Sequence, residues 1–292
     1  MAPLVKALQR DTEHFETKVC VTAQHRQMLD QVLEVFDIIP DYDLNIMAPN
    51  QDLYDITTKV LLGLRDVLKD FCPDTVLVHG DTTTSMAASL AAFYRQVAVG
   101  HVEAGLRTYD MLSPWPEEMN RQVTDRICTY YFAPTGKSKQ NLLQENIDAK
   151  KIFVTGNTVI DALLMAVDII SKKPGIKEKL HQELRDKGYE VGQREYILVT
   201  GHRRENFGEG FLHICKAIRE LAALHPEMDI VYPVHLNPAV RDTAERILGD
   251  VQNVYLIPPV DVEDMHNIMD RSFLVMTDSG GLQEEAPSCG VP

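Results

Sequence analysis

Two carboxylates follow directly on apolar segments of the sequence. Asp81 comes after VLVHG, and Glu103 comes after VAVGHV. Both segments have the composition of buried strands, and an open α/β sheet binds its ligands at the carboxyl ends of such strands. A carboxyl group in a dry site can take up and return protons, because burial raises its pKa towards neutrality. The two acids indicate proton transfer, although Asp81 before TTT is also typical of a helix N-cap.

A histidine stands two residues before each of these acids. His79 precedes Asp81, and His101 precedes Glu103. In an extended chain each such pair shares one face, as two metal ligands would. No third ligand and no HExxH helix accompanies them, so the sequence favours proton transfer over metal binding. We predict no metal site and no cofactor.

A further acidic segment is SPWPEEMNR (113–121), in which Glu117 and Glu118 follow a proline. Proline followed by acids is ordinary chemistry for the start of a helix, and that alone would explain both residues. The catalytic and the structural interpretation of Glu117 both stay open at this point.

The second half of the chain carries two segments suited to an anion. VTGHRRENFG follows an apolar strand and puts His202 and Arg203 in one loop, which is either an anion clamp or a solvated basic patch. TDSGGLQEEAPS follows another strand, and the amides of Ser279, Gly280 and Gly281 would meet a phosphate at the positive end of a helix. Glu285, one helical turn later, could hold ribose hydroxyls.

The elements that must position these residues alternate along the chain. Apolar segments rich in Val and Ile predict strands, and amphipathic stretches between them predict helices, so the sheets are parallel and covered on both faces. The strand segments are KVCVT, TVLVH, VAVGHV, YYFAP, KIFVT, YILVT, DIVYPV, VYLI and FLVMT. The sequence predicts an α/β protein of two doubly wound, Rossmann-like domains that face each other across a cleft. A KKPG break separates them, so the domains are residues 1–172 and 173–292.

Both ends of the chain look incomplete. MAPLVKALQRD predicts a helix where a βαβ unit should begin with a strand, and EEAPSCGVP stops where another strand should follow. We expect a chain truncated at both termini.

Composition narrows the function further. The chain has 292 residues, and 29 Lys and Arg against 43 Asp and Glu give a net charge of −14, which argues against a nucleic-acid partner. No GxGxxG or GxxxxGK[ST] motif occurs, which argues against a dinucleotide redox enzyme or an NTPase. The five cysteines are spread singly, as in a reduced protein. The sequence has neither a signal peptide nor a membrane span, so we expect a cytoplasmic protein without membrane insertion.

Several motifs together closely resemble the non-hydrolysing UDP-N-acetylglucosamine 2-epimerases. They are AQHRQMLDQVLEVF, LVHGDTTTSMAASLAAFY, GHVEAGLRTYDMLSPWPEEMNR, GNTVIDAL, VTGHRREN, YPVHLNP and TDSGGLQEEAPS. The resemblance covers essentially the whole chain. It implies the two-domain nucleotide-sugar fold of many glycosyltransferases (GT-B), no cofactor and a homodimer. It also implies that the family's initial strand and GTRPE loop, and its segment beyond SCGVP, are missing here.

The resemblance also assigns roles to residues. It implies that Asp81, Glu103 and Glu117 are the catalytic carboxylates and that His202 is catalytic or contacts the substrate. Ser279, Gly280, Gly281 and Glu285 match the UDP-binding residues, and Val260 and Met265 stand near the uracil, where relatives often carry a larger side chain. Gln24, Gln27, Arg203 and His235 match the site at which a second UDP-GlcNAc acts as activator.

The activity implied is reversible epimerisation at C2 between UDP-GlcNAc and UDP-ManNAc, by elimination of UDP to 2-acetamidoglucal and re-addition. This reaction supplies ManNAc for surface polysaccharides. Three alternatives stay open: a hydrolysing 2-epimerase, a glycosyltransferase of the same fold, and an inactive fragment that binds nucleotide sugars.

Overall fold

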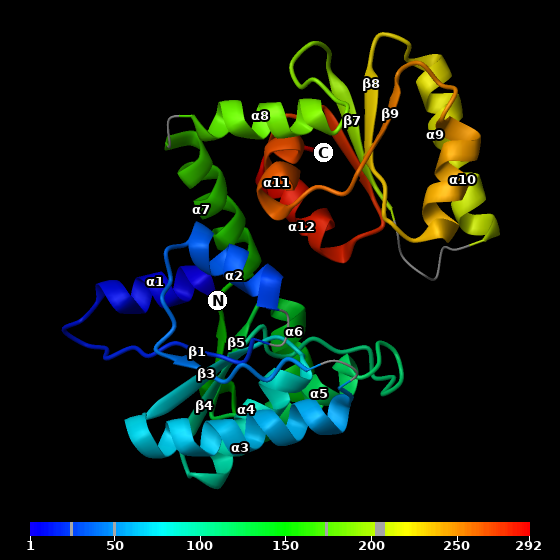
Figure 1. The fold of residues 1–292 in the computed structure, drawn as a ribbon. Helices are drawn as coiled ribbons and strands as arrows, with labels where there is room; N and C mark the ends of the chain where they lie inside the picture. Colours follow the sequence, from blue (N-terminus) through cyan, green and yellow to red (C-terminus); the bar gives the residue numbers. More distant parts are fainter. Residues whose placement is uncertain (24–25, 49–50, 173–174, 202–207) are drawn as a thin grey trace. The chain divides into compact units, whose positions relative to one another are not determined.

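The chain divides into two compact units, Met1–Thr158 and Val159–Pro292, which are drawn in Figure 1. The structure is a computed structural model that describes residues 1–23, 26–48, 51–172, 175–201 and 208–292. Within these ranges no helix has both the length and the apolar character needed to cross a membrane. That the two units face each other across a cleft remains a prediction from the sequence.

The first unit alternates helices and strands along the chain (Figure 1). Its elements are α1 (Ala2–Arg10), β1 (Cys20–Val21), α2 (Arg26–Val35), β2 (Tyr42–Asp43), α3 (Leu53–Phe71), β3 (Thr75–His79), α4 (Thr83–Tyr94), β4 (Ala98–Val102), α5 (Glu117–Ile127), β5 (Tyr130–Ala133), α6 (Gly136–Gln144) and β6 (Ile152–Val154), with a 3-10 turn at Ala149–Lys151 before β6.

A parallel four-stranded sheet in the order β3-β4-β5-β6 forms the centre of this unit, and β1 and β2 make a separate parallel pair. Helix α4 packs on β3 and β4 and against α3. Small side chains such as Ala88 and Ala92 let α4 lie close to Val60 and Leu64 of α3, and all four belong to one buried apolar cluster. Val78 of β3 and Val99 of β4 belong to the same cluster, so it holds the two strands and the two helices together.

The second unit has the same alternation. Its elements are α7 (Thr158–Lys172), α8 (Ile176–Asp186), β7 (Tyr196–Thr200), α9 (Glu209–Leu224), β8 (Asp229–Pro233), α10 (Pro238–Leu248), β9 (Val254–Ile257), α11 (Val262–Asp270), β10 (Leu274–Thr277) and α12 (Gly280–Ser288).

The sheet of the second unit is also parallel, in the order β10-β7-β8-β9. Strands β7, β8 and β9 follow one another to one side, and the chain then returns to add β10 on the other side of β7. The strand order therefore reverses between β7 and β10. In open α/β sheets the ligand binds at such a reversal, beyond the carboxyl ends of the two strands.

The α/β architecture predicted from the sequence is confirmed, and each predicted strand segment forms a strand. The pair partner β2 was not predicted, because a strand of two residues carries no periodicity. Helix α7 is grouped with the second unit, whereas the sequence division at residue 172 places it in the first. The reason is that Leu163 of α7 packs with Leu184 and Tyr189 in a core of the second unit.

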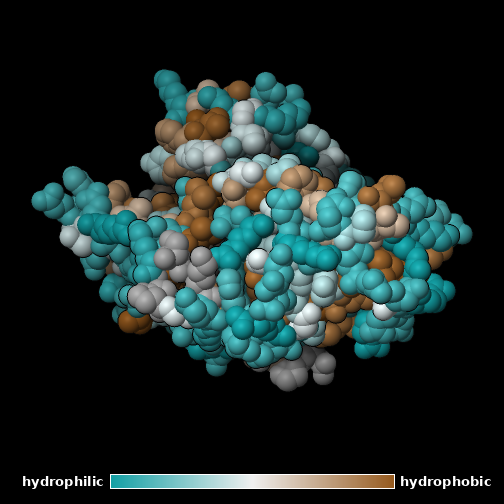
Figure 2. Space-filling model, turned by 90° about the horizontal axis from the view of Figure 1, so that it is seen from above, coloured by the Kyte–Doolittle hydropathy of each residue, from teal (hydrophilic) through white to brown (hydrophobic). Residues whose placement is uncertain are grey.

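The surface agrees with the acidic composition. The face drawn in Figure 2 is largely hydrophilic, with hydrophobic side chains scattered in small groups. Charged residues make up 25% of the chain, and such residues are mostly exposed, which accounts for this hydrophilic surface.

Candidate active site

Asp81 and Glu103 come from neighbouring strands of the first sheet. In the parallel register His79 of β3 lies beside Val102 of β4, so the two acids leave the sheet at the same edge. Gly80 turns the chain between the end of β3 and Asp81 with a left-handed φ of +69°, and a Cβ added there would lie 3.1 Å from Glu103 Oε2. A side chain at position 80 would therefore press on the carboxylate.

Helix α5 brings charged and polar groups to Asp81. Arg121 Nη2 lies 3.0 Å from Asp81 Oδ2, and Asn120 Nδ2 donates to the Asp81 carbonyl at 2.9 Å. Burial raises the pKa of Asp81; the Arg121 charge counteracts this, and the Glu117 charge adds to it. Glu117 lies one helical turn before Arg121 in the same helix. Sequence reasoning did not single out Arg121 and Asn120, although both lie in the quoted SPWPEEMNR segment.

The N-cap interpretation of Asp81 is wrong. The N-cap of α4 is Thr82, whose Oγ1 accepts from the Ser85 amide at 3.1 Å. Thr82 already satisfies that free amide, so capping does not explain the presence of an acid at position 81.

Glu103 has an unusual backbone conformation. Its φ is +72°, in the left-handed region that non-glycine residues rarely adopt, and its amide donates to the Phe132 carbonyl at 3.0 Å. His79 Nε2 lies 4.0 Å from Glu103 Oε2. Burial lowers the pKa of His79 to about 4, so the imidazole is neutral near pH 7. Left-handed residues with bulky side chains concentrate at functional sites, where the surrounding structure holds them.

Glu117 and Glu118 begin α5 but have different environments. Glu118 is fully buried and accepts from the amides of Thr108 and Tyr109, each at 3.0 Å. Burial alone would raise the pKa of Glu118, but the hydrogen bonds from Gln122 and the two amides lower it. Glu118 therefore anchors the preceding loop, whereas the half-buried Glu117 is the acid near Asp81.

In the second unit the predicted phosphate segment lies at the strand reversal. Thr200 of β7 and Thr277 of β10 are joined by a hydrogen bond between their hydroxyls at 2.7 Å. Ser279 is the N-cap of α12, and its hydroxyl makes no capping hydrogen bond to the described residues of that helix. Gly280 and Gly281 are exposed. The first amides of α12 are thus open to an anion.

The Glu285 carboxylate lies beside Gly281 in this turn. A Cβ added at Gly281 would lie 3.7 Å from Glu285 Oε1 and 3.9 Å from Ser279 Oγ, so the carboxylate and the hydroxyl border the same space. Burial, and after it the charge of Glu284, raises the pKa of Glu285.

The residues predicted near the uracil and at the activator site have few described contacts. Val260 and Met265 are half-buried against the apolar core of the second unit. His235 is exposed after β8, and its Nδ1 accepts from the Asn237 amide at 3.0 Å. Gln24, His202 and Arg203 lie outside the described residues, and of Gln27 only the backbone, in α2, is described.

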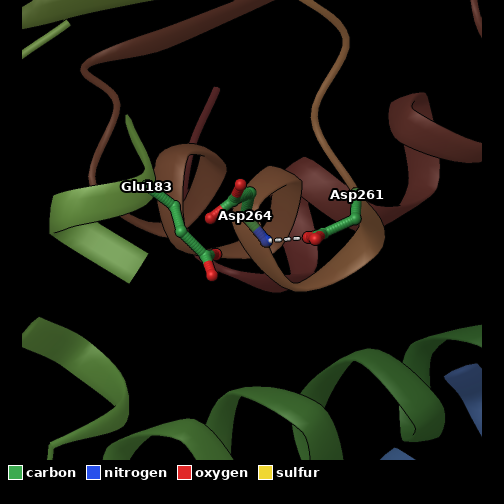
Figure 3. A group of neighbouring side chains, drawn as sticks. All are labelled: Glu183, Asp261 and Asp264. Carbon is green, nitrogen blue, oxygen red and sulfur yellow. Dashed lines mark hydrogen bonds between the residues drawn. The ribbon is translucent and has the colours of Figure 1, made fainter. Parts of the chain in front are cut away.

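Three carboxylates of the second unit meet in a further group, drawn in Figure 3. Glu183, Asp261 and Asp264 bring their oxygens within 4.8 Å of one another. Asp261 accepts from the Asp264 amide as the N-cap of α11, and Lys187 Nζ lies 2.7 Å from Asp264 Oδ2. The helix cap explains Asp261, and the ion pair with Lys187 explains Asp264.

The His101 and Glu103 pair is not arranged as metal ligands. His101 Nδ1 lies 2.6 Å from Asp125 Oδ1, and its Nε2 lies 2.9 Å from the Gly80 carbonyl. Both ring nitrogens are therefore already bound within the protein.

Comparison with known proteins gives a consistent result. Residues 6–292 match the family model described as UDP-N-acetylglucosamine 2-epimerase. Proteins of that name from Salmonella typhimurium and Escherichia coli K12 are 58% and 56% identical to this chain, and the matches cover 100% of this chain and 77% of each relative.

Solved structures agree with the sequence matches. The crystal structure of UDP-GlcNAc 2-epimerase from Neisseria meningitidis bound to UDP-GlcNAc superposes with a TM-score of 0.87 at 51% identity, covering 100% of this chain and 77% of that one. The enzyme from Methanocaldococcus jannaschii in complex with UDP-GlcNAc and UDP gives a TM-score of 0.76 at 33% identity, covering 100% and 78%.

Proposed function

Because this chain belongs to the UDP-N-acetylglucosamine 2-epimerase family, we propose that it interconverts UDP-GlcNAc and UDP-ManNAc. The observation that carries the proposal is the convergence of Asp81 and Glu103 at one sheet edge, with Glu117 one helical turn before Arg121, the ion-pair partner of Asp81. Inversion at carbon needs one group to remove a proton and another to return it on the opposite face. A site with several acids meets that need.

The C2 proton of the sugar is not adjacent to a carbonyl group, so it becomes removable only as the C1–O bond to UDP breaks. A carboxylate takes the C2 proton, the electrons of the C2–H bond form the C1=C2 double bond, and the electron pair of the C1–O bond leaves with UDP. The product is 2-acetamidoglucal. In the return step a UDP oxygen attacks C1, and an acid delivers a proton to the other face of C2. We assign these proton transfers to Asp81, Glu103 and Glu117.

The leaving pyrophosphate carries the charge that must be stabilised. The open amides of Gly280 and Gly281 at the start of α12, together with the helix dipole, are suited to that charge. We place UDP there, with Glu285 on the ribose hydroxyls, Val260 and Met265 near the uracil, and His202 contacting the substrate. The relative from Neisseria meningitidis, solved with UDP-GlcNAc bound, supports a nucleotide-sugar ligand.

The finer proposals concern partners and physiology. We propose that a second UDP-GlcNAc binds at Gln24, Gln27, Arg203 and His235 as activator, that the protein is a cytoplasmic homodimer, and that its product feeds surface polysaccharide synthesis. The structure of the Methanocaldococcus jannaschii relative with both UDP-GlcNAc and UDP is compatible with two nucleotide sites in that protein.

The first experiment follows the C2 proton. The protein is incubated with UDP-GlcNAc in deuterated water, with the Salmonella typhimurium relative as a positive control, and C2 and the products are observed by NMR. We expect deuterium at C2 and the appearance of UDP-ManNAc. Free N-acetylmannosamine with UDP would instead indicate a hydrolysing enzyme, and no exchange beside an active control would overturn the proposal for this chain.

The nucleotide site is tested separately by Glu285→Gln. Hydrogen bonds to a charged group contribute about 1.5–3 kcal/mol, so we expect the affinity for UDP to fall about 10- to 100-fold. Isothermal titration with UDP measures this without requiring turnover. The matched control is Glu220→Gln at an exposed position of α9 in the same unit, which we expect to bind UDP as the unaltered chain does. Equal affinities of all three proteins would remove Glu285 from the site.

A further inference from the structure

Directly beneath the two strand-end acids lies a buried network of charged residues. We propose that His101 and Asp125 are positioning residues that hold the Gly80–Asp81 turn and the Glu103–Gly105 turn in their working geometry. The inference rests on the proposed function, because it concerns where the two acids are held. Neither residue would touch the substrate.

Asp125 of α5 is the centre of the network. Its Oδ1 lies 2.6 Å from His101 Nδ1, and its Oδ2 accepts from the Gly105 amide at 3.2 Å and lies 2.8 Å from Arg107 Nη2. The Asp125 side chain is fully buried. One carboxylate thus binds both the histidine and the turn two residues after Glu103.

His101 links Asp125 to the turn that holds Asp81. Its Nε2 lies 2.9 Å from the Gly80 carbonyl, one residue before Asp81. A carbonyl only accepts, so Nε2 donates. Nδ1 faces Asp125 Oδ1 at 2.6 Å, so one imidazole ring joins the Asp125 carboxyl group to the Gly80 carbonyl.

The ionisable side chains of this network are all paired. His101 and Arg107 both contact Asp125, and Arg107 also donates to Glu145, from Nε at 2.6 Å and from Nη2 at 3.0 Å. The exposed Arg126 adds a contact of 3.9 Å from its Nη2 to Glu145 Oε2. The side chains of His101, Arg107 and Asp125 are at most 1% exposed, and that of Glu145 is 15% exposed. Buried charges are tolerated when they are paired and hydrogen-bonded in this way, and such a network is rigid.

The backbone that the network holds is unfavourable on its own. Gly80, Glu103 and Gly105 all have left-handed φ angles, of 69°, 72° and 87°. Glu103 needs surrounding contacts to stay in that conformation, because it is not glycine. Misplacing a reacting group by about 1 Å costs on the order of 100-fold in rate, so a network that fixes two such turns bears directly on turnover.

The test removes the hydrogen bond to the Gly80 carbonyl without leaving a buried carboxylate unpaired. In an Asp125→Asn background no carboxylate faces position 101, and Arg107 keeps its ion pair with Glu145. Two further substitutions are made in that background: H101Q, whose amide can donate to the Gly80 carbonyl, and H101M, which has similar length and no donor.

We expect the H101M protein to have a kcat about 10- to 100-fold below that of the H101Q protein, comparable to the effect of removing supporting contacts at other active sites. The affinity for UDP should be the same in both, and rates are referred to the folded fraction from urea unfolding. Tyr131→Phe is the control, because it removes a buried hydroxyl that donates to the Asp125 and Cys128 carbonyls without touching either turn. We expect it to lose stability and keep its kcat.

Equal kcat values for the H101Q and H101M proteins would overturn the inference. A second measurement needs no substitution: in the unaltered protein, ¹⁵N NMR of the histidine rings should show a hydrogen on His101 Nε2, because the Gly80 carbonyl can only accept. His101 Nε2 at the unprotonated shift would also overturn the inference. An unaltered chain that exchanges no C2 proton overturns the proposed function instead, and the ring spectrum still decides on the network.

Discussion

Replacing Asp81 with asparagine is expected to slow C2 deuterium exchange by about 100- to 10,000-fold, the range that proton transfer by a positioned side chain contributes. The amide is close in shape to the carboxylate, so Arg121 and the Gly80 turn keep their places while the proton acceptor is lost. The rate of loss of the C2 proton signal in deuterated water measures the effect. The control is Asp66→Asn, an exposed acid of α3 in the same unit.

The Asp81→Asn variant should lose activity but not stability. Because burial raises the pKa of Asp81, the folded protein binds this proton more tightly than the unfolded chain does, and ionised Asp81 disfavours folding near neutral pH. Asparagine has no such penalty, so the variant should unfold at an equal or higher urea concentration at pH 7. The difference should shrink as the pH falls towards the ordinary Asp pKa of 3.8. A variant that is both fully active and less stable would contradict the role given to Asp81.

The sequence was informative wherever a pattern is local. The strands of both sheets are continuous apolar segments, and the strand-end acids and the SGG turn stand next to them, so topology alone brings them to ligand-binding edges. Short pairing such as that of β2 has no local pattern, and Thr82, not the acid beside it, caps α4. Either residue could have capped the helix, and only the fold decides between them.

Helix α5 shows why the supporting groups could not be predicted. Its buried positions are polar or charged: Glu118, Asn120, Arg121, Thr124 and Asp125. A helix usually buries its apolar face, so this sequence predicts that the same residues face solvent. Their burial depends on partners far away in sequence, such as His101 for Asp125 and Asp81 for Arg121. Departures from the usual pattern are expected at functional sites.

Replacing Gly105 with alanine is expected to have the largest effect on stability. An added Cβ would lie 2.4 Å from the Ser138 carbonyl oxygen and 2.9 Å from Leu142 Cγ, both in α6. The left-handed φ of +87° costs about 1–2 kcal/mol for alanine, and overpacking a filled site costs about 1–3 kcal/mol more. A loss of about 2–5 kcal/mol is a large part of the stability of a typical domain, and urea unfolding measures it.

The glycine cannot easily shift to relieve this overlap, because both of its backbone groups are bound. Its amide donates to Asp125 Oδ2, and its carbonyl accepts from Asn141 Nδ2 at 3.0 Å. Gly156→Ala is the matched control: its φ is +82°, and nothing lies within 4 Å of the added Cβ, so only the backbone strain of about 1–2 kcal/mol applies. The difference between the unfolding free energies of the two variants therefore gives the cost of the steric overlap between the added Cβ and α6. Equal losses would mean that α6 moves aside, and that the Glu103–Gly105 turn is held less rigidly than its hydrogen bonds require.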